Sequence, residues 1–285
     1  MFIGILSKNK ITESGAEPLF DTYPALIGWS LRKLSNTATK SIRVRRDSDD
    51  AETDILLTNS GSLTTSSFIT GGSVTLGTWA STDDVHIVKW YNQGSSGSTN
   101  EPTTVTQALQ PIILSSGVVE EEGSLAASIW SSANVLTLTT IVLSDFSMFM
   151  VIKPPTLDNA INVVLGNNAA GWANVGGTLG SFNTNMIIYG ASRKGAIING
   201  KGQNIYEFYN SKVYVNNVED TPYTSSGTLT QMQVTYLGGR FDNGSQRFGG
   251  ASNDAKMQEI IIYSSDQAVN REVINSDIKT FYGTP

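Results

Sequence analysis

Four consecutive residues near position 90 bring aromatic rings and side-chain amides into one short stretch. They are Trp90, Tyr91, Asn92 and Gln93. An aromatic ring packs on the apolar face of a sugar, and Asn and Gln amides form hydrogen bonds with its hydroxyl groups. We therefore take these four residues as a candidate carbohydrate-binding site. A structural alternative stays open: Trp90 ends an apolar run and would then lie in the core, with Tyr91 on the opposite side.

A cluster of arginines offers a second kind of ligand chemistry. The stretch 41–46 alternates between apolar residues, Ile42 and Val44, and basic residues, which indicates a strand. The basic residues are Arg43, Arg45 and Arg46, and the acidic residues that follow are Asp49, Asp50, Glu52 and Asp54. This pattern predicts a surface charge ladder across neighbouring strands. The alternative is a bidentate grip on the carboxylate of a ligand.

Other catalytic and metal-binding chemistry has little support in the residue types. The chain has no cysteine and one histidine, His86, which excludes disulfides, thiolate nucleophiles and zinc sites built on sulfur. The acidic run Glu120-Glu121-Glu122 is predicted to be a solvated turn, because adjacent carboxylates point in different directions. We expect no catalytic residue, no cofactor and no metal. Calcium is the alternative, with ligands from a late acidic segment: Asp242, Asn243 and Asp254.

Charge and hydropathy limit the partners. A formal net charge of -6 argues against a nucleic-acid partner, because phosphate neutralisation needs a basic face. The apolar start, 1–6, is shorter than the apolar region of a secretory signal, so we expect no signal peptide. No uncharged apolar run approaches the roughly 20 residues of a membrane span.

The elements that must position the candidate residues are predicted to be strands. With 27 glycines, 15% charged residues and many Ser, Thr and Asn, the 285-residue chain has the composition of a many-turned β protein. A sandwich of this length forms one domain. We therefore predict an arm or edge strand over 1–18 and a single β-sandwich domain over 19–285.

A stretch near the C-terminus is predicted to be the central strand. Residues 257–263 read Met-Gln-Glu-Ile-Ile-Ile-Tyr, and consecutive apolar residues indicate burial on both faces. A helix near 267–281 should follow, because Val269, Val273, Ile274, Ile278 and Phe281 recur at helical spacing. Asp266 is its predicted N-cap and Gly283 its predicted end.

The rest of the chain adds a second short helix and further strands. The helix is expected near residues 24–35, where Leu26, Ile27, Trp29, Leu31 and Leu34 would share one side. Strands are predicted over 85–91, 146–153, 161–165, 186–189, 205–208, 212–218 and 231–237. The predicted fold class is thus all-β, an antiparallel β-sandwich with two short helices.

Several blocks in the first half of the chain resemble a known family. They are DTYP (21–24), WSLRKL (29–34), IRVRRDSDDAETDI (42–55), WYNQ (90–93) and QP (110–111). In order and spacing they are similar to the catalytic domain of fungal-type α-L-arabinofuranosidase B, and to concanavalin A-like, laminin-G-like domains of bacteriophage and environmental bacterial proteins. The later blocks LGGR (237–240) and MQEIIIY (257–263) resemble the last strands of such jelly rolls. The resemblance implies a concanavalin A-like jelly roll.

The departures from the family weigh against an enzyme. Where the family usually has Asp-Gln-Ser-Gly-Asn after the Trp-Tyr pair, this chain has an amide at Asn92, which cannot act as a base. Gly238-Gly239 is followed by Arg240, where the enzyme branch has a carboxylate. The carboxylate pair that glycoside hydrolysis requires is therefore not found in the sequence.

We interpret the chain as a non-enzymatic bacteriophage virion structural protein, a fibre, decoration or other exposed component, with a lectin-like domain that binds host cell-surface glycans. The alternatives are a glycoside hydrolase of the α-L-arabinofuranosidase type and a purely architectural subunit. The expected location is the virion, and the expected partners are other virion proteins and further copies of this chain. The apolar residues 1–6 would bury a few hundred Å² against a neighbour, worth several kcal/mol at about 25 cal/mol per Å² before ordering costs.

Overall fold

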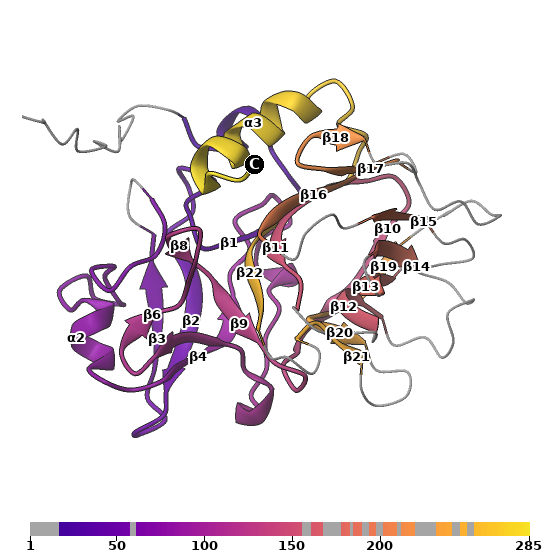
Figure 1. The fold of residues 1–285 in the computed structure, drawn as a ribbon. Helices are drawn as coiled ribbons and strands as arrows, with labels where there is room; N and C mark the ends of the chain where they lie inside the picture. The colour runs from indigo at the N-terminus through magenta and orange to yellow at the C-terminus, as the bar shows by residue number, and fades with distance from the viewer. Residues whose placement is uncertain are drawn as a thin grey trace, which may run out of the picture.

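The computed structural model of this chain describes residues 17–57, 61–155, 161–167, 178–182, 185–189, 194–197, 202–209, 212–219, 232–240, 246–249 and 254–285. Within these residues the chain forms an antiparallel β-sandwich with few helices (Figure 1). The predicted fold class is therefore confirmed. Residues 1–16 of the predicted arm lie outside the described residues, and so do Asp242 and Asn243 of the calcium alternative.

The larger sheet has 12 strands. In spatial order its main path is β18 (Val218–Glu219), β17 (Lys212–Val215), β16 (Asn204–Tyr209), β11 (Ser147–Lys153), β22 (Ala255–Tyr263), β9 (Ser128–Trp130), β5 (Ile112–Ser115), β4 (Val85–Trp90), β2 (Lys40–Arg46) and β3 (Glu52–Leu56). Off this path, β1 (Ile27–Ser30) pairs with β22, and β6 (Val118–Val119) pairs with β5.

The smaller sheet has six strands and forms the second layer. Its order is β10 (Leu136–Leu143), β19 (Met232–Leu237), β12 (Ile161–Gly166), β13 (Thr178–Phe182), β14 (Asn185–Tyr189) and β15 (Lys194–Ile197). Two small pairs complete the described strands: β7 (Glu121–Glu122) with β8 (Leu125–Ala126), and β20 (Gly239–Arg240) with β21 (Gln246–Arg247). Each strand predicted from the sequence in the second half of the chain has a counterpart, and the stretch 212–218 forms a hairpin of β17 and β18 with a turn at Asn216-Asn217.

Strand β22 lies at the centre of the larger sheet, as its apolar run predicts. One edge pairs with β11 along most of its length, and the other edge pairs with β9 and then with β1. Ile260 and Ile262 face the core between the two sheets, whereas Ile261 and Tyr263 belong to a second apolar cluster on the other face. Both faces of β22 are apolar because each face packs against its own apolar cluster.

The second cluster is covered by helix α3 (Arg271–Tyr282), drawn at the top of Figure 1. Its apolar residues pack in one cluster with residues of β11, β16 and α1 (Leu19–Thr22). Ile274, Ile278 and Tyr282 are buried against the sheet at a spacing of four residues. Gly283 ends the helix in the left-handed conformation with φ 64°, as predicted.

Two details of the predicted C-terminal helix are wrong. The N-cap is Asn270 rather than Asp266, whose carboxylate instead accepts a hydrogen bond from the Ala268 N–H in the turn before the helix. Val269 and Val273 are 92% and 52% exposed, because Val269 precedes the helix and Val273 lies about 100° from the buried side.

The predicted helix near residues 24–35 is also wrong. The chain there forms β1, whose four residues are all buried and pair with β22 from Ile27↔Ile262 to Ser30↔Glu259. A short apolar run fits a buried strand as well as a helix, and burial on both faces decides for the strand. The remaining helical turns are α2 (Leu76–Ala80), η1 (Gly97–Asn100) and η2 (Gln107–Leu109).

Candidate functional site

Trp90 lies in the core between the two sheets. It is the last residue of β4, pairs with Ile42 of β2 and is fully buried. Its indole nitrogen has no hydrogen-bond partner among the described residues. The contacts of Trp90 are thus those of a core residue, which was the structural alternative at this position.

Asn92 uses its amide to close the loop that follows β4. Its Oδ1 accepts hydrogen bonds from the backbone N–H groups of Gly28 at 2.8 Å and Gly94 at 2.9 Å. Its Nδ2 donates to Ser96 Oγ at 2.8 Å and to the Gly97 carbonyl at 3.1 Å. Both polar atoms of this side chain therefore have partners within the protein.

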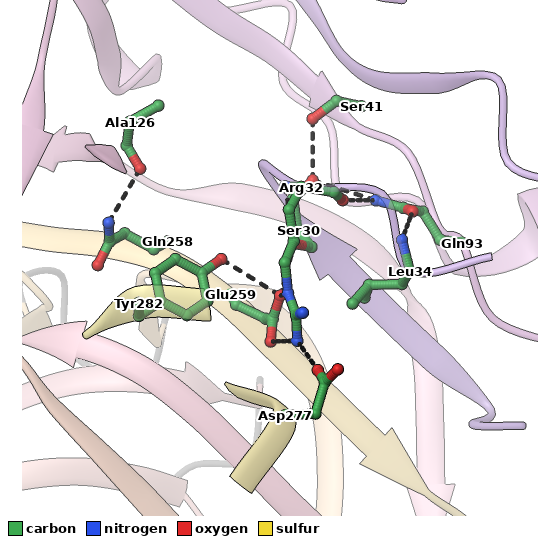
Figure 2. A network of polar contacts seen from close by, with 10 residues as sticks. All are labelled: Ser30, Arg32, Leu34, Ser41, Gln93, Ala126, Gln258, Glu259, Asp277 and Tyr282. Carbon is green, nitrogen blue, oxygen red and sulfur yellow. Dashed lines mark hydrogen bonds and ion pairs between the residues drawn. The ribbon is translucent and has the colours of Figure 1, made fainter. Parts of the chain in front are cut away.

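Gln93 joins the same loop to the segment after β1. Its side chain is buried, and its Oε1 accepts from the Leu34 N–H at 2.7 Å (Figure 2). Its Nε2 donates to the carbonyls of Arg32 at 2.8 Å and Ser30 at 3.2 Å. Buried backbone groups need hydrogen-bond partners. The Gln93 amide supplies these partners to the segment after β1, as a neighbouring strand would.

Tyr91 points to the face opposite Trp90 and is partly exposed. Its hydroxyl donates to Asp54 Oδ1 at 2.6 Å. The ammonium groups of Lys40 and Lys89 lie 5.4 and 5.5 Å from the centre of its ring. Partial burial and the bond to the Asp54 carboxylate both raise the pKa of the Tyr91 phenol, so the hydroxyl stays protonated and acts as a donor.

We call the surface around this tyrosine the polar face; its residues are Lys40, Arg43, Glu52, Asp54, Lys89, Tyr91 and Glu101. Four ion pairs cross it: Lys40–Asp54 at 2.6 Å, Arg43–Glu52 at 3.0 Å, Arg43–Asp54 at 3.8 Å and Lys89–Glu101 at 3.2 Å. Burial opposes ionisation of Asp54, but hydrogen bonds from Lys40 and Tyr91 outweigh it and lower the pKa of this carboxyl. The charge ladder predicted from the sequence is confirmed.

Arg45 departs from the rest of the ladder because its side chain is only 7% exposed. It bonds Gln110 Oε1 at 2.9 Å, Asp50 at 2.8 Å and Asp47 at 2.7 Å. Asp47 also approaches His86 Nε2 at 3.2 Å. The Arg45 guanidinium is therefore paired with Asp47 and Asp50 of the chain itself. Arg45 is one of the arginines that were considered as binding a ligand carboxylate.

A buried polar network lies beneath helix α3 (Figure 2). Glu259, fully buried on β22, accepts from the Arg32 guanidinium at 2.8 and 3.1 Å, from Ser30 Oγ at 2.7 Å and from the Tyr282 hydroxyl at 3.2 Å. Arg32 also binds Asp277 of α3 at 2.6 Å. Burial lowers the pKa of Arg32, but the two carboxylates outweigh burial and raise it. The network ties β1, β22 and α3 together.

A second buried carboxylate holds the other end of α3. Glu207 of β16 binds Arg271 at 3.1 Å and accepts hydrogen bonds from Asn275 and from the backbone N–H of Asn217. Burial raises the pKa of Glu207, although Arg271 opposes this shift. In both networks an arginine neutralises the buried charge.

The acidic run at 120–122 is not a solvated turn. Glu121 and Glu122 form β7, and Lys153 lies 3.5 Å from Glu122. Lys256 lies 3.7 Å from Glu120 and 3.9 Å from Glu122. The prediction is wrong because the lysines that neutralise the run come from distant strands, which the sequence does not indicate.

Sequence reasoning missed several residues of these networks. Lys40 and Lys89 flank Tyr91 only because β2 and β4 pair, and Glu101 reaches Lys89 from a loop. A signal did exist for Glu259, since a charge inside a strand buried on both faces requires a partner. Among the described residues no group of three or more His, Asp or Glu is arranged to hold a metal, and no described helix is long and apolar enough to cross a membrane.

Comparison with known proteins gives a likeness at the level of solved structures. No family model matches the chain, and no curated protein matches it. A mutant GH54 α-L-arabinofuranosidase soaked with 4-nitrophenyl α-L-arabinofuranoside is similar with a TM-score of 0.57 and 13% identity, over 93% of this chain and 64% of that chain. A GH54 α-L-arabinofuranosidase soaked with a cyclic sulfate inhibitor gives 0.56 and 13%, with the same coverage of 93% and 64%.

An arabinofuranosidase complexed with arabinofuranosyl-α-1,2-xylobiose has a TM-score of 0.50 and 12% identity, over 91% of this chain and 63% of that chain. The likeness is one of fold. This chain spans less than two thirds of the length of these neighbours, at 63–64%. The β-sandwich implied by the sequence resemblance is confirmed.

Proposed function

We propose that this chain is a non-enzymatic structural protein of a bacteriophage virion, and that its β-sandwich binds host-surface glycans at the polar face. The observation that carries the glycan part is the position of Tyr91, a partly exposed ring directly after β4 with ionised groups around it. Sugar sites combine an aromatic ring with fixed donors and acceptors. The fold likeness to arabinofuranosidases is consistent with a carbohydrate ligand.

The roles within the predicted site differ in this proposal. Tyr91 contacts the ligand, while Asn92 and Gln93 hold the loop through their bonds to backbone groups. Trp90 supports the strand from the core. The virion part of the proposal rests on the sequence blocks that resemble laminin-G-like domains of phage proteins.

A glycan array with the purified chain tests the binding proposal. We expect binding to at least one glycan, with affinity about tenfold weaker, or about 1.4 kcal/mol, in Tyr91→Ala. Phe68→Ala is the matched control, because Phe68 is a 40% exposed aromatic residue outside the polar face. Binding that survives both Tyr91→Ala and Gln93→Ala would remove this site from consideration.

Purified phage particles test the virion proposal. We expect the chain in the particles at a fixed copy number, as measured by quantitative mass spectrometry. Deletion of residues 1–10 should leave the described domain folded and weaken self-association or incorporation, because these residues are proposed to contact another copy or another virion protein. A truncated chain that assembles normally would contradict the role of the arm.

A glycoside hydrolase of the α-L-arabinofuranosidase type is the second candidate, favoured by the fold likeness. Hydrolysis needs two carboxyl groups that flank one glycosidic bond. The buried carboxylates Glu207 and Glu259 are bound by arginines, and Asp54 and Glu101 of the polar face by lysines. Release of arabinose from an aryl arabinofuranoside by the pure chain would favour the hydrolase. A chain that is present in particles and binds no glycan would be a purely architectural subunit.

A further inference from the structure

The polar face exposes its ammonium groups and hides the carboxylates that hold them. The side chain of Lys40 is 42% exposed, whereas that of its partner Asp54 is 9% exposed. The side chain of Lys89 is 31% exposed, whereas that of Glu101 is 11% exposed. The Arg43–Glu52 pair is 41% exposed on both sides and is balanced. The excess of exposed positive charge around Tyr91 therefore comes from Lys40 and Lys89, although the chain as a whole carries a net charge of -6.

Both ammonium groups keep donors for a ligand. A lysine ammonium has three N–H donors. Lys40 donates to Asp54 at 2.6 Å and Lys89 donates to Glu101 at 3.2 Å. Because both ammonium groups lie within 5.5 Å of the centre of the Tyr91 ring, the ring and the two cations form one compact group.

We propose that Lys40, Lys89 and Tyr91 bind the anionic substituent of an acidic glycan, a carboxylate or a phosphate ester, with the sugar against the tyrosine. This inference rests on the proposed glycan-binding function and specifies its ligand class. The anion contacts the two ammonium groups, whereas Arg43 on the same face is already paired with the equally exposed Glu52.

The two lysine side chains are more exposed than the carboxylates that bind them, and this difference favours an anionic ligand over a neutral one. An anion gains Coulomb attraction to both ammonium groups in addition to hydrogen bonds, whereas a neutral hydroxyl gains the hydrogen bonds alone. The carboxylates of Asp54 and Glu101 fix the lysine side chains in place, which reduces the ordering cost when the ligand binds. A neutral sugar would pack on Tyr91 and accept hydrogen bonds from the lysines, but it would gain no attraction between opposite charges.

The test compares three probes by titration calorimetry: an oligogalacturonate, a neutral galacto-oligosaccharide of the same length, and a glycerol phosphate oligomer. We expect at least one acidic probe to bind about tenfold more tightly than the neutral probe, and which one binds identifies carboxylate or phosphate as the anion. This preference should fall as salt rises from about 50 to 500 mM, because exposed charges are screened.

Substitutions of Lys40 and Lys89 test whether these two residues bind the anion. Lys40→Gln and Lys89→Gln should each weaken binding of the acidic probe about tenfold and weaken binding of the neutral probe less, and Lys40→Arg should retain most of the acidic preference. Lys212→Gln is the matched control, since Lys212 forms a similar pair with Glu219 at 3.1 Å on β17, at the other end of the sheet. Thermal unfolding of each variant reports its folding.

The outcomes separate the two proposals. Equal binding of acidic and neutral probes, insensitive to salt and to both lysine variants, would overturn this inference and leave glycan binding intact. Binding of no probe and no glycan on the array would overturn both. An acidic preference that persists in the Lys40→Gln, Lys89→Gln double variant would place the anion elsewhere and contradict the assignment.

Discussion

Replacing Arg32 by methionine should destabilise the chain strongly, because Glu259 would stay buried without its cation. The Arg32 side chain is 6% exposed and Glu259 is 0% exposed, and two hydrogen bonds of 2.8 and 3.1 Å join them. Removing one partner of a buried ion pair costs about 3–5 kcal/mol. The bonds from Ser30 and Tyr282 to Glu259 remain, so we expect the lower half of this range.

Urea unfolding measures this loss as a change in the free energy of unfolding, and a double-mutant cycle with Glu259→Met isolates the coupling. The double variant should be more stable than the sum of the single losses predicts, since no charge stays buried. Arg43→Met is the matched control: the Arg43–Glu52 pair is 41% exposed on both sides, and a surface pair contributes about 0.2–1 kcal/mol. Equal losses for the Arg32 and Arg43 variants, or additive losses in the cycle, would refute the reasoning.

Three further predictions concern acid stability, the loop after β4 and the core. The pKa of Asp54 is below its ordinary value of 3.8, so its contribution to stability is present above pH 3.8 and is lost as the pH falls through the folded-state pKa. Asp54→Asn should therefore lower the unfolding free energy at pH 7, and the difference from the parent should shrink as the pH falls below 3.8; a loss that does not change with pH would count against this. Gln93→Ala should lower the free energy of unfolding in urea by about 1–3 kcal/mol, because it leaves buried backbone groups without hydrogen-bond partners. A loss below about 0.5 kcal/mol, which is the scatter of surface substitutions, would be inconsistent with the three hydrogen bonds of Gln93. Ile261→Ala should lower the free energy of unfolding by about 2–5 kcal/mol, whereas Val273→Ala, at a 52% exposed position, should change it by less than about 0.5 kcal/mol. Similar melting temperatures for the two variants would contradict the burial of β22 on both faces.

Local patterns in the sequence were sufficient for the fold class and for most strands. The run 257–263 predicts a central strand because three consecutive isoleucines require cover on both faces of a strand, and β22 is such a strand. The alternation over 41–46 likewise predicts the charge ladder of β2. Gly283 marks the end of α3 because it adopts a left-handed conformation that other residues disfavour.

The tertiary structure decided what these elements do with their polar side chains. Residues 26–34 contain enough apolar positions for either a helix or a strand, and pairing with β22 selects the strand. Strand pairing brings Lys40 and Asp54 next to Tyr91, although they are distant from it in sequence. A loop brings Glu101 to Lys89. Hydrogen bonds and ion pairs act over about 3 Å in space, so their partners depend on which strands become neighbours, and a sequence pattern records only neighbours along the chain.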